Sequence, residues 1–157
     1  MKDEKGSTTI QSLLFIAIFV LILSMAFELW KVVAVKQSVQ AATYQAAKYI
    51  ALNGLNWGLS EKEWEIQVWP FIVTELRNNP FIPVDSFRAG GLKPNPDIRI
   101  ILNPQCNRQN YCDRGQFSIQ VGLEYIVFIP PRFGEPNAKP MQLKFTRSVQ
   151  SQLECYP

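Results

Sequence analysis

The segment STTIQSLLFIAIFVLILSMAF, residues 7–27, contains no Asp, Glu, Lys or Arg, and from Ser12 onward it is almost entirely apolar. A bilayer core about 30 Å thick needs roughly 20 apolar residues in a helix, and this segment is about that long. It also lacks the polar stripe that a buried helix of a water-soluble protein shows. We therefore expect a transmembrane helix over 7–28, closed by Glu28 and Lys31.

The pattern changes after the span. Apolar residues now recur at spacings of three and four, at Val32, Val35, Val39, Ala42, Ala46 and Tyr49. No Gly or Pro interrupts 7–53, so the span and an amphipathic extension over 29–53 are expected to form one helix of about 45 residues. Small side chains let helices approach closely, which makes Ala42 and Ala46 candidate contacts with the helix of another subunit. The alternative is that this stripe packs on the chain's own domain.

The remaining segment, 54–157, is expected to form a head domain. Gly54 is placed to end the first helix. Ser60 followed by Glu63 is a capping-box signature and predicts a second helix over Glu61–Arg77, kinked or split at Pro70.

Alternation of apolar and polar residues then predicts three strands, in DIRIILN, QFSIQVGLEYIVF and MQLKFTRSVQSQLE. The residues expected on the inner face are Ile98, Ile100, Leu102, Phe117, Ile119, Val121, Leu123, Tyr125, Met141, Leu143, Phe145 and Val149. The first two strands are joined through the cysteine segment and the last two through PPRFGEPNAKP, which favours an antiparallel meander with one face covered by helices. The fold class predicted is α+β, with a long N-terminal helix, a second helix and a three-stranded antiparallel sheet.

The chain has three cysteines and no histidine. Cys106 and Cys112 lie in NPQCNRQNYCDRG, a segment of turn-forming residues, where a small disulfide loop is favoured. A zinc site would need a further ligand from a carboxylate or a second chain, because three cysteines without histidine do not complete the usual set. Cys155 is either a free thiol or a competitor for one of the other two.

Charge and residue types argue against several functions. The net charge is +3, with sixteen basic and thirteen acidic residues and no block of like sign, so nucleic acid is not expected as a partner. Without histidine the usual general base is missing. The scattered charges at Arg132, Glu135, Arg147 and Glu154 form no catalytic or metal-binding motif. We expect no enzyme activity, no metal and no cofactor.

Lysines lie on both sides of the span, so the positive-inside rule does not decide its orientation. A disulfide would require everything after Phe27 to lie outside the cytoplasm. Ser24-Met25-Ala26 has the form that signal peptidase cuts after, which leaves a secreted domain as an alternative. Against it, the apolar run is longer than the hydrophobic region of a usual signal peptide. The preceding segment MKDEKG also carries as many acids as lysines.

MKDEKG, residues 1–6, is a short charged leader ending in glycine, directly before small polar residues and the apolar run. Beyond it, FELWKVVAVKQSVQAATYQAAKYIA closes the span with an acidic residue and Leu and continues as an Ala-rich segment. Over Lys5–Leu52 the chain resembles TadE-like minor pilins, of the type IV pilin and pseudopilin group. The resemblance implies cleavage between Gly6 and Ser7 by a prepilin peptidase, insertion in a bacterial inner membrane with the head domain outside the cytoplasm, and a pilin-like fold.

Two positions depart from the family pattern. Gln11 would be the fifth mature residue, where pilins usually carry a Glu that neutralises a neighbouring subunit's amino terminus. An amide cannot offset that charge, so the departure favours a minor or initiating subunit. Ala17 stands where family members often carry a proline, so a straighter helix is expected. Gln11 and Glu28 are candidate contacts with another subunit. Gln11 has the alternative interpretation of a polar residue near the membrane face, and Glu28 that of an interfacial acid facing water.

From this resemblance we expect a subunit that assembles a type IV (Tad-like) pilus or a related secretion apparatus by helix packing. Its partners would be other pilin subunits, the prepilin peptidase, the assembly platform of the inner membrane and the lipid bilayer. The principal alternative is an uncleaved membrane-anchored binding domain that does not polymerise.

Overall fold

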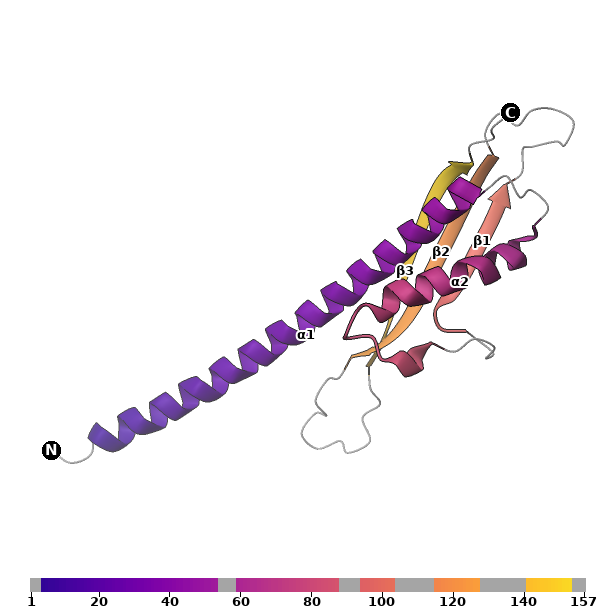
Figure 1. Cartoon of the computed structure of the whole chain (residues 1–157). Helices are drawn as coiled ribbons and strands as arrows, with labels where there is room; N and C mark the ends of the chain where they lie inside the picture. Colours follow the sequence, from indigo (N-terminus) through magenta and orange to yellow (C-terminus); the bar gives the residue numbers. More distant parts are fainter. Residues whose placement is uncertain (1–3, 54–58, 88–93, 104–114, 128–140, 154–157) are drawn as a thin grey trace, which may run out of the picture. The chain divides into compact units, whose positions relative to one another are not determined.

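The computed structural model describes residues 4–53, 59–87, 94–103, 115–127 and 141–153, and in the first helix it describes side chains from Ile10 onward. Two helices and a short 3-10 turn precede three strands: α1 (Glu4–Asn53), α2 (Glu61–Arg77), η1 (Val84–Ser86), β1 (Asp97–Asn103), β2 (Gly115–Val127) and β3 (Met141–Leu153). The strands form one antiparallel sheet in the order β1-β2-β3 (Figure 1). The predicted α+β fold is confirmed, and its elements follow in the predicted order.

The chain divides into two compact units, Met1–Val33 and Ala34–Pro157. The helix α1 continues through the boundary without a break and begins at Glu4, before the expected start at Ser7. We call the second unit the head. The head thus begins inside α1, so that most of the amphipathic extension predicted over 29–53 belongs to the folded domain.

One face of the sheet is buried and the other is exposed. The register pairs Ile100 with Ile119 and Leu123 with Phe145, so that most apolar residues of the three strands lie on one face, while Ile101 and Ile126 lie exposed on the other. On the central strand β2 every second residue from Phe117 to Val127 is buried. The opposite face carries mainly Gln, Ser, Thr and charged side chains. This one-sided burial confirms the alternation predicted from the sequence.

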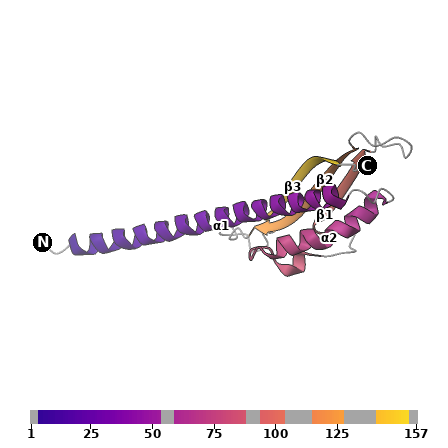
Figure 2. The same ribbon diagram turned by 45° about the horizontal axis from the view of Figure 1, so that its top comes forward.

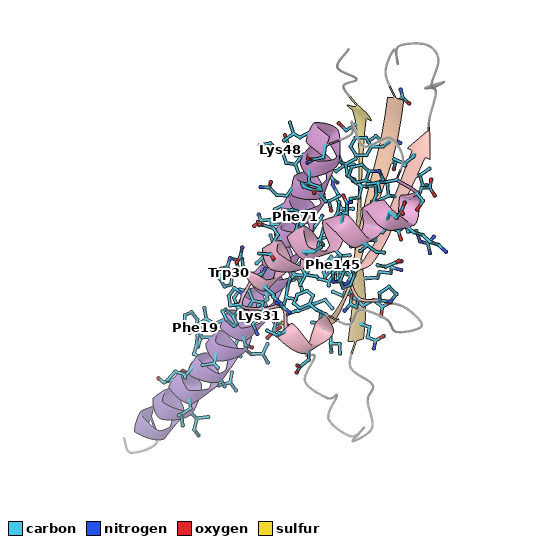
Figure 3. The ribbon with its side chains drawn as sticks, turned by 45° about the vertical axis from the view of Figure 1, so that its right-hand side comes forward. Phe19, Trp30, Lys31, Lys48, Phe71 and Phe145 are labelled. Carbon is cyan, nitrogen blue, oxygen red and sulfur yellow. The ribbon has the colours of Figure 1, made fainter. Side chains whose placement is uncertain are left out.

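Two helical segments cover the apolar face. Figures 1 and 2 show α2 and the part of α1 after Ala34 on the same side of the sheet. Tyr49 of α1 lies against Phe71 of α2, with ring centroids 4.4 Å apart (Figure 3). The buried residues of these helices are Val35, Val39, Ala42, Thr43, Ala46, Ala47, Ile50, Trp64, Val68, Ile72, Val73 and Leu76. The core of the head therefore lies between this helical layer and the sheet.

The second helix is not split at Pro70. It runs unbroken from Glu61 to Arg77, although a proline in a helix interior removes one hydrogen bond to the carbonyl four residues earlier. Pro70 lies on the exposed side of α2, while Val68, Ile72 and other apolar residues are buried. Packing of that buried face outweighs the lost hydrogen bond, so the split, one of the two outcomes predicted for Pro70, does not occur.

A polar contact ties α1 to the end of α2. Asn79 is buried, and its Nδ2 donates to the Oγ of Ser38 over 2.7 Å. The Oδ1 of Asn79 accepts from the backbone N–H of Phe81 over 2.9 Å. The Ser38 hydroxyl in turn donates to the carbonyl of Ala34 over 3.2 Å. Because both ends of the amide are bonded, this buried polar residue fixes how the two helices meet without an unsatisfied group.

Carboxylates of α2 cover the outer edge of β1. The backbone N–H of Leu102 donates to Oε1 of Glu61 over 3.0 Å, and that of Ile100 to Oε1 of Glu65 over 3.4 Å. Glu61 and Glu65 are four residues apart and so lie on the same side of the helix. Both donors would otherwise be unpaired groups of an edge strand, so α2 closes this edge of the sheet.

The capping box predicted at the start of α2 is present, and it gives a pH-dependent prediction. The backbone N–H of Ser60 donates to Oε2 of Glu63 over 2.6 Å, and the Ser60 hydroxyl donates to the same oxygen over 2.9 Å. These two bonds, the backbone one first, hold the pKa of Glu63 below its usual value. A lowered carboxyl pKa stabilises the fold above the unfolded pKa, and this stabilisation is lost as the pH falls through the folded pKa.

We therefore expect Glu63→Gln to destabilise the head most at neutral pH, with the difference from wild type vanishing below the ordinary carboxyl range. Ser60→Ala should cost about 1 kcal/mol at neutral pH. Urea unfolding at a series of pH values measures both effects. The exposed Lys62, which lies outside the box, provides the control variant Lys62→Gln. A Glu63→Gln difference that persists unchanged in acid would contradict this account of the cap.

Candidate functional site

The candidate functional site is the N-terminal part of α1. Every side chain from Ile10 to Phe27 is exposed, and most of them are large and apolar (Figure 3). By length and composition this helix could cross a membrane. Fully exposed Leu, Ile and Phe over five turns would be costly in water, so this surface calls for lipid or another protein around it.

The few polar side chains of the span are compatible with an apolar environment. The hydroxyl of Ser24 donates to the carbonyl of Leu21 over 2.9 Å, so the donor is satisfied within the helix. Such a bond removes most of the cost of burying a hydroxyl in hydrocarbon. Ser24 therefore does not argue against membrane insertion.

An aromatic and ionic cluster marks the end of the span. The Nζ of Lys31 lies 2.7 Å from Oε1 of Glu28 and 4.6 Å from the centroid of the Phe27 ring. The ring centroids of Phe27 and Trp30 are 5.9 Å apart, and Trp30 is 56% exposed. Aromatic rings combined with a lysine are typical of the level at which a helix leaves the hydrocarbon. We call these four residues the boundary cluster.

The boundary cluster refines what the sequence suggested for Glu28. That residue was expected either to contact another subunit or to face water alone, whereas in the structure it is paired with Lys31 three residues later. The pairing neutralises both charges at the end of the apolar segment. Sequence reasoning overlooked Trp30 and the contact of Lys31 with Phe27. The sequence signal for this cluster was the spacing of Phe27, Trp30 and Lys31 over about one helical turn.

The other predicted site residues fall in three situations. Gln11 is exposed on the span. Gly6 and Ser7 belong to the first turns of α1, where only the backbone is described. Cys106 and Cys112 lie outside the described residues, as does Cys155, so their pairing remains a prediction.

Ala42 and Ala46 have no exposed surface in the head. Their stripe packs inside the chain's own domain, because small side chains let α1 approach its neighbours in the head closely. This is the alternative stated for the stripe, and it corrects their use as contacts to another subunit. Exposed residues of the same segment, such as Tyr44 and Lys48, remain accessible (Figure 3 labels Lys48).

Within the described part of the chain, no group of three His, Cys, Asp or Glu side chains is placed to hold a metal ion. Of the charges weighed for catalysis, Arg147 is exposed on β3, and Arg132, Glu135 and Glu154 lie outside the described residues. The surface features of the described chain are thus an exposed apolar helix and a one-sided sheet. Comparison with protein-family models, curated proteins and solved structures finds no match to this chain.

Proposed function

We propose that the chain is a TadE-like minor pilin or pseudopilin, which assembles into or beneath a type IV (Tad-like) pilus or a related secretion apparatus. The observation that carries the proposal is the continuity of α1. The exposed apolar segment runs without a break into a helix that is built into the core of a folded head. A simple anchor needs no such continuity, whereas a subunit held in a filament by its helix does.

In this proposal the protein is inserted in the bacterial inner membrane by the segment 7–28, with the head outside the cytoplasm. A prepilin peptidase cuts between Gly6 and Ser7, and Gln11 lies near the new amino terminus of a neighbouring subunit. The uncharged Gln11 suits a subunit that is not repeated along the filament. An oxidising compartment would allow Cys106 and Cys112 to form a disulfide.

The helix contacts of this proposal come from the span. Its exposed side chains from Ile10 to Phe27 would pack against other pilin subunits or lipid, and the boundary cluster would mark the depth at which the helix leaves the bilayer.

The amino-terminal residue and intact mass of the protein from native membranes test this function, with and without thiol alkylation. We expect a chain starting at Ser7, lacking MKDEKG, and carrying one thiol that alkylates without prior reduction. Gly6→Leu should leave the leader attached, because a large side chain would disturb the cleavage position. A wild-type chain that starts at Met1 would indicate a permanent anchor, and one that starts at Phe27 a secreted domain. Either start would refute the pilin proposal.

A further inference from the structure

The two edges of the sheet differ in whether other parts of the described chain cover them. At the β1 edge, carboxylates of α2 accept the outward N–H groups of Ile100 and Leu102. At the other edge β3 is 13 residues long and pairs only with β2. Among the described residues, no hydrogen bond reaches the outer side of the β3 backbone. One edge is thus closed by the chain itself and the other is open.

The register shows which groups of β3 face outward. Since the N–H groups of Ile100 and Leu102 point away from β2, the ladder bonds of β1 come from the residues between them. On β2 the residues opposite them are Ser118 and the other even-numbered residues, and these bond to β1. The odd-numbered residues of β2 therefore bond to β3. Their partners on β3 are odd-numbered as well. The outward N–H and C=O groups therefore belong to Gln142, Lys144, Thr146, Ser148 and Gln150.

A second observation concerns the apolar face at this edge. On β2 the side chains of Ile119 and Leu123 have no exposed surface. Their partners on β3, Val149 and Phe145, are only half-buried (Figure 3 labels Phe145). Met141 at the start of β3 is 49% exposed. The apolar layer of the head thus continues to β3 without being fully covered there, and a further strand alongside would extend it.

The charge of β3 indicates which kind of strand could pair with its outer edge. It carries Lys144 and Arg147, both exposed, and no acidic residue. If two copies of β3 paired antiparallel over their full length, Arg147 would face its own copy, and like charges directly opposite destabilise a strand pair. A strand with carboxylates on the exposed face of the sheet would instead gain attraction at Lys144, while Arg147, the partner of the buried Val121, lies on the apolar face. Charges of this kind on an edge strand exclude wrong partners while they permit a complementary one.

From these observations we propose that the open edge of β3 binds an extended, acidic strand of a different protein by strand addition. Backbone groups of the even-numbered residues 142–150 would bond to the added strand, whose carboxylates on the exposed face of the sheet lie opposite Lys144. Its apolar residues, at every second position, extend the face formed by Leu143, Phe145 and Val149. This inference does not rest on the pilin proposal, because it uses only the head.

The test measures hydrogen exchange of single amides in the full-length protein in detergent micelles. The probe is a nine-residue peptide of alternating Val and Glu, and its control is the same peptide with Lys in place of Glu. With the acidic peptide at nine-tenths occupancy, we expect the even-numbered amides 142–150 to exchange roughly tenfold more slowly, since about one molecule in ten remains uncovered. The lysine peptide should leave them unchanged.

Two variants sharpen the test. Ser148→Pro removes one outward N–H without removing a bond to β2, because proline is tolerated at such edge positions, and it should weaken binding of the acidic peptide. The unchanged exchange of the odd-numbered amides would show that its sheet is intact. Lys144→Gln combined with Arg147→Gln should remove the preference for the acidic peptide over the lysine peptide.

Four outcomes would overturn the proposal. Even-numbered amides that are already protected in dilute protein without peptide would mean that the chain covers this edge itself. Protection that appears only as the protein concentration rises would assign the edge to a second copy of the chain. Equal protection by both peptides, or undiminished binding by Ser148→Pro, would show that the contact is not the specific strand addition described.

Discussion

Ile16→Arg combined with Phe19→Arg is expected to remove the protein from the membrane. Both side chains are about midway along the exposed apolar part of α1, with 60% and 61% of their surface exposed. Each replacement of an apolar residue by Arg at the centre of a span costs about 3 kcal/mol in membrane insertion, so the pair costs about 6 kcal/mol. This is enough to shift a single span from inserted to excluded. Alkaline washing of membranes measures the change, with wild type retained in the pellet and the variant released or degraded.

The matched control is Gln37→Arg with Gln40→Arg. These exposed positions have the same spacing on the same helix but lie in the head. They should leave membrane retention unchanged, since the added charges stay in water. If the variant at Ile16 and Phe19 were retained as firmly as wild type, the apolar segment of α1 would not be the membrane span. Release of wild type itself by the alkaline wash would lead to the same conclusion.

The regular elements could be predicted because each has a local signature. The span follows from the uninterrupted apolar run, the second helix from Ser60 and Glu63, and the strands from apolar residues at every second position. The face that each strand buries followed from the same alternation, and Ile119 and Leu123 lie where the pattern put them. In these segments, local preference and tertiary packing act in the same direction.

The features that could not be predicted depend on distant contacts. The bonds of Glu61 and Glu65 to β1 join residues far apart in the chain. Pro70 was expected to kink or split α2 because its local effect is known, whereas the packing that holds the helix together comes from elsewhere. For the same reason, the sequence did not decide whether Ala42 and Ala46 pack inside the chain or against another subunit. A stripe of small residues shows that something packs closely, but not whether the neighbour is the same chain.

The candidate site was predictable in outline and not in detail. An apolar helix that ends near Glu28 could be read from composition, whereas the pairing of Glu28 with Lys31 and the ring contacts of Phe27 required side-chain geometry. The openness of the β3 edge had no signal in the sequence of β3. The open edge was recognised only by comparison with the edge of β1, which α2 covers.

Phe117→Ala is expected to destabilise the head by about 3 to 5 kcal/mol, the usual cost of removing a buried phenylalanine from a core. Phe117 is 2% exposed and is among the largest fully buried side chains of the chain. It lies on the central strand, opposite Leu102 on one side and Ser151 on the other, so that both edge strands lose a contact. A loss of this size takes up much of the 5 to 15 kcal/mol that holds a typical domain folded. Urea unfolding followed by tryptophan fluorescence measures it.

Phe71→Ala is the matched aromatic control. Phe71 is 46% exposed and contacts Tyr49 across the two helices, a pairing worth about 0.5 to 1.5 kcal/mol beyond buried area. Its removal should therefore cost clearly less than that of Phe117, because water already reaches its ring and no closed cavity is left. Equal losses for the two variants would mean that the core does not lie between the helices and β2. The ratio of the two losses thus tests the position of the core independently of the total stability of the head.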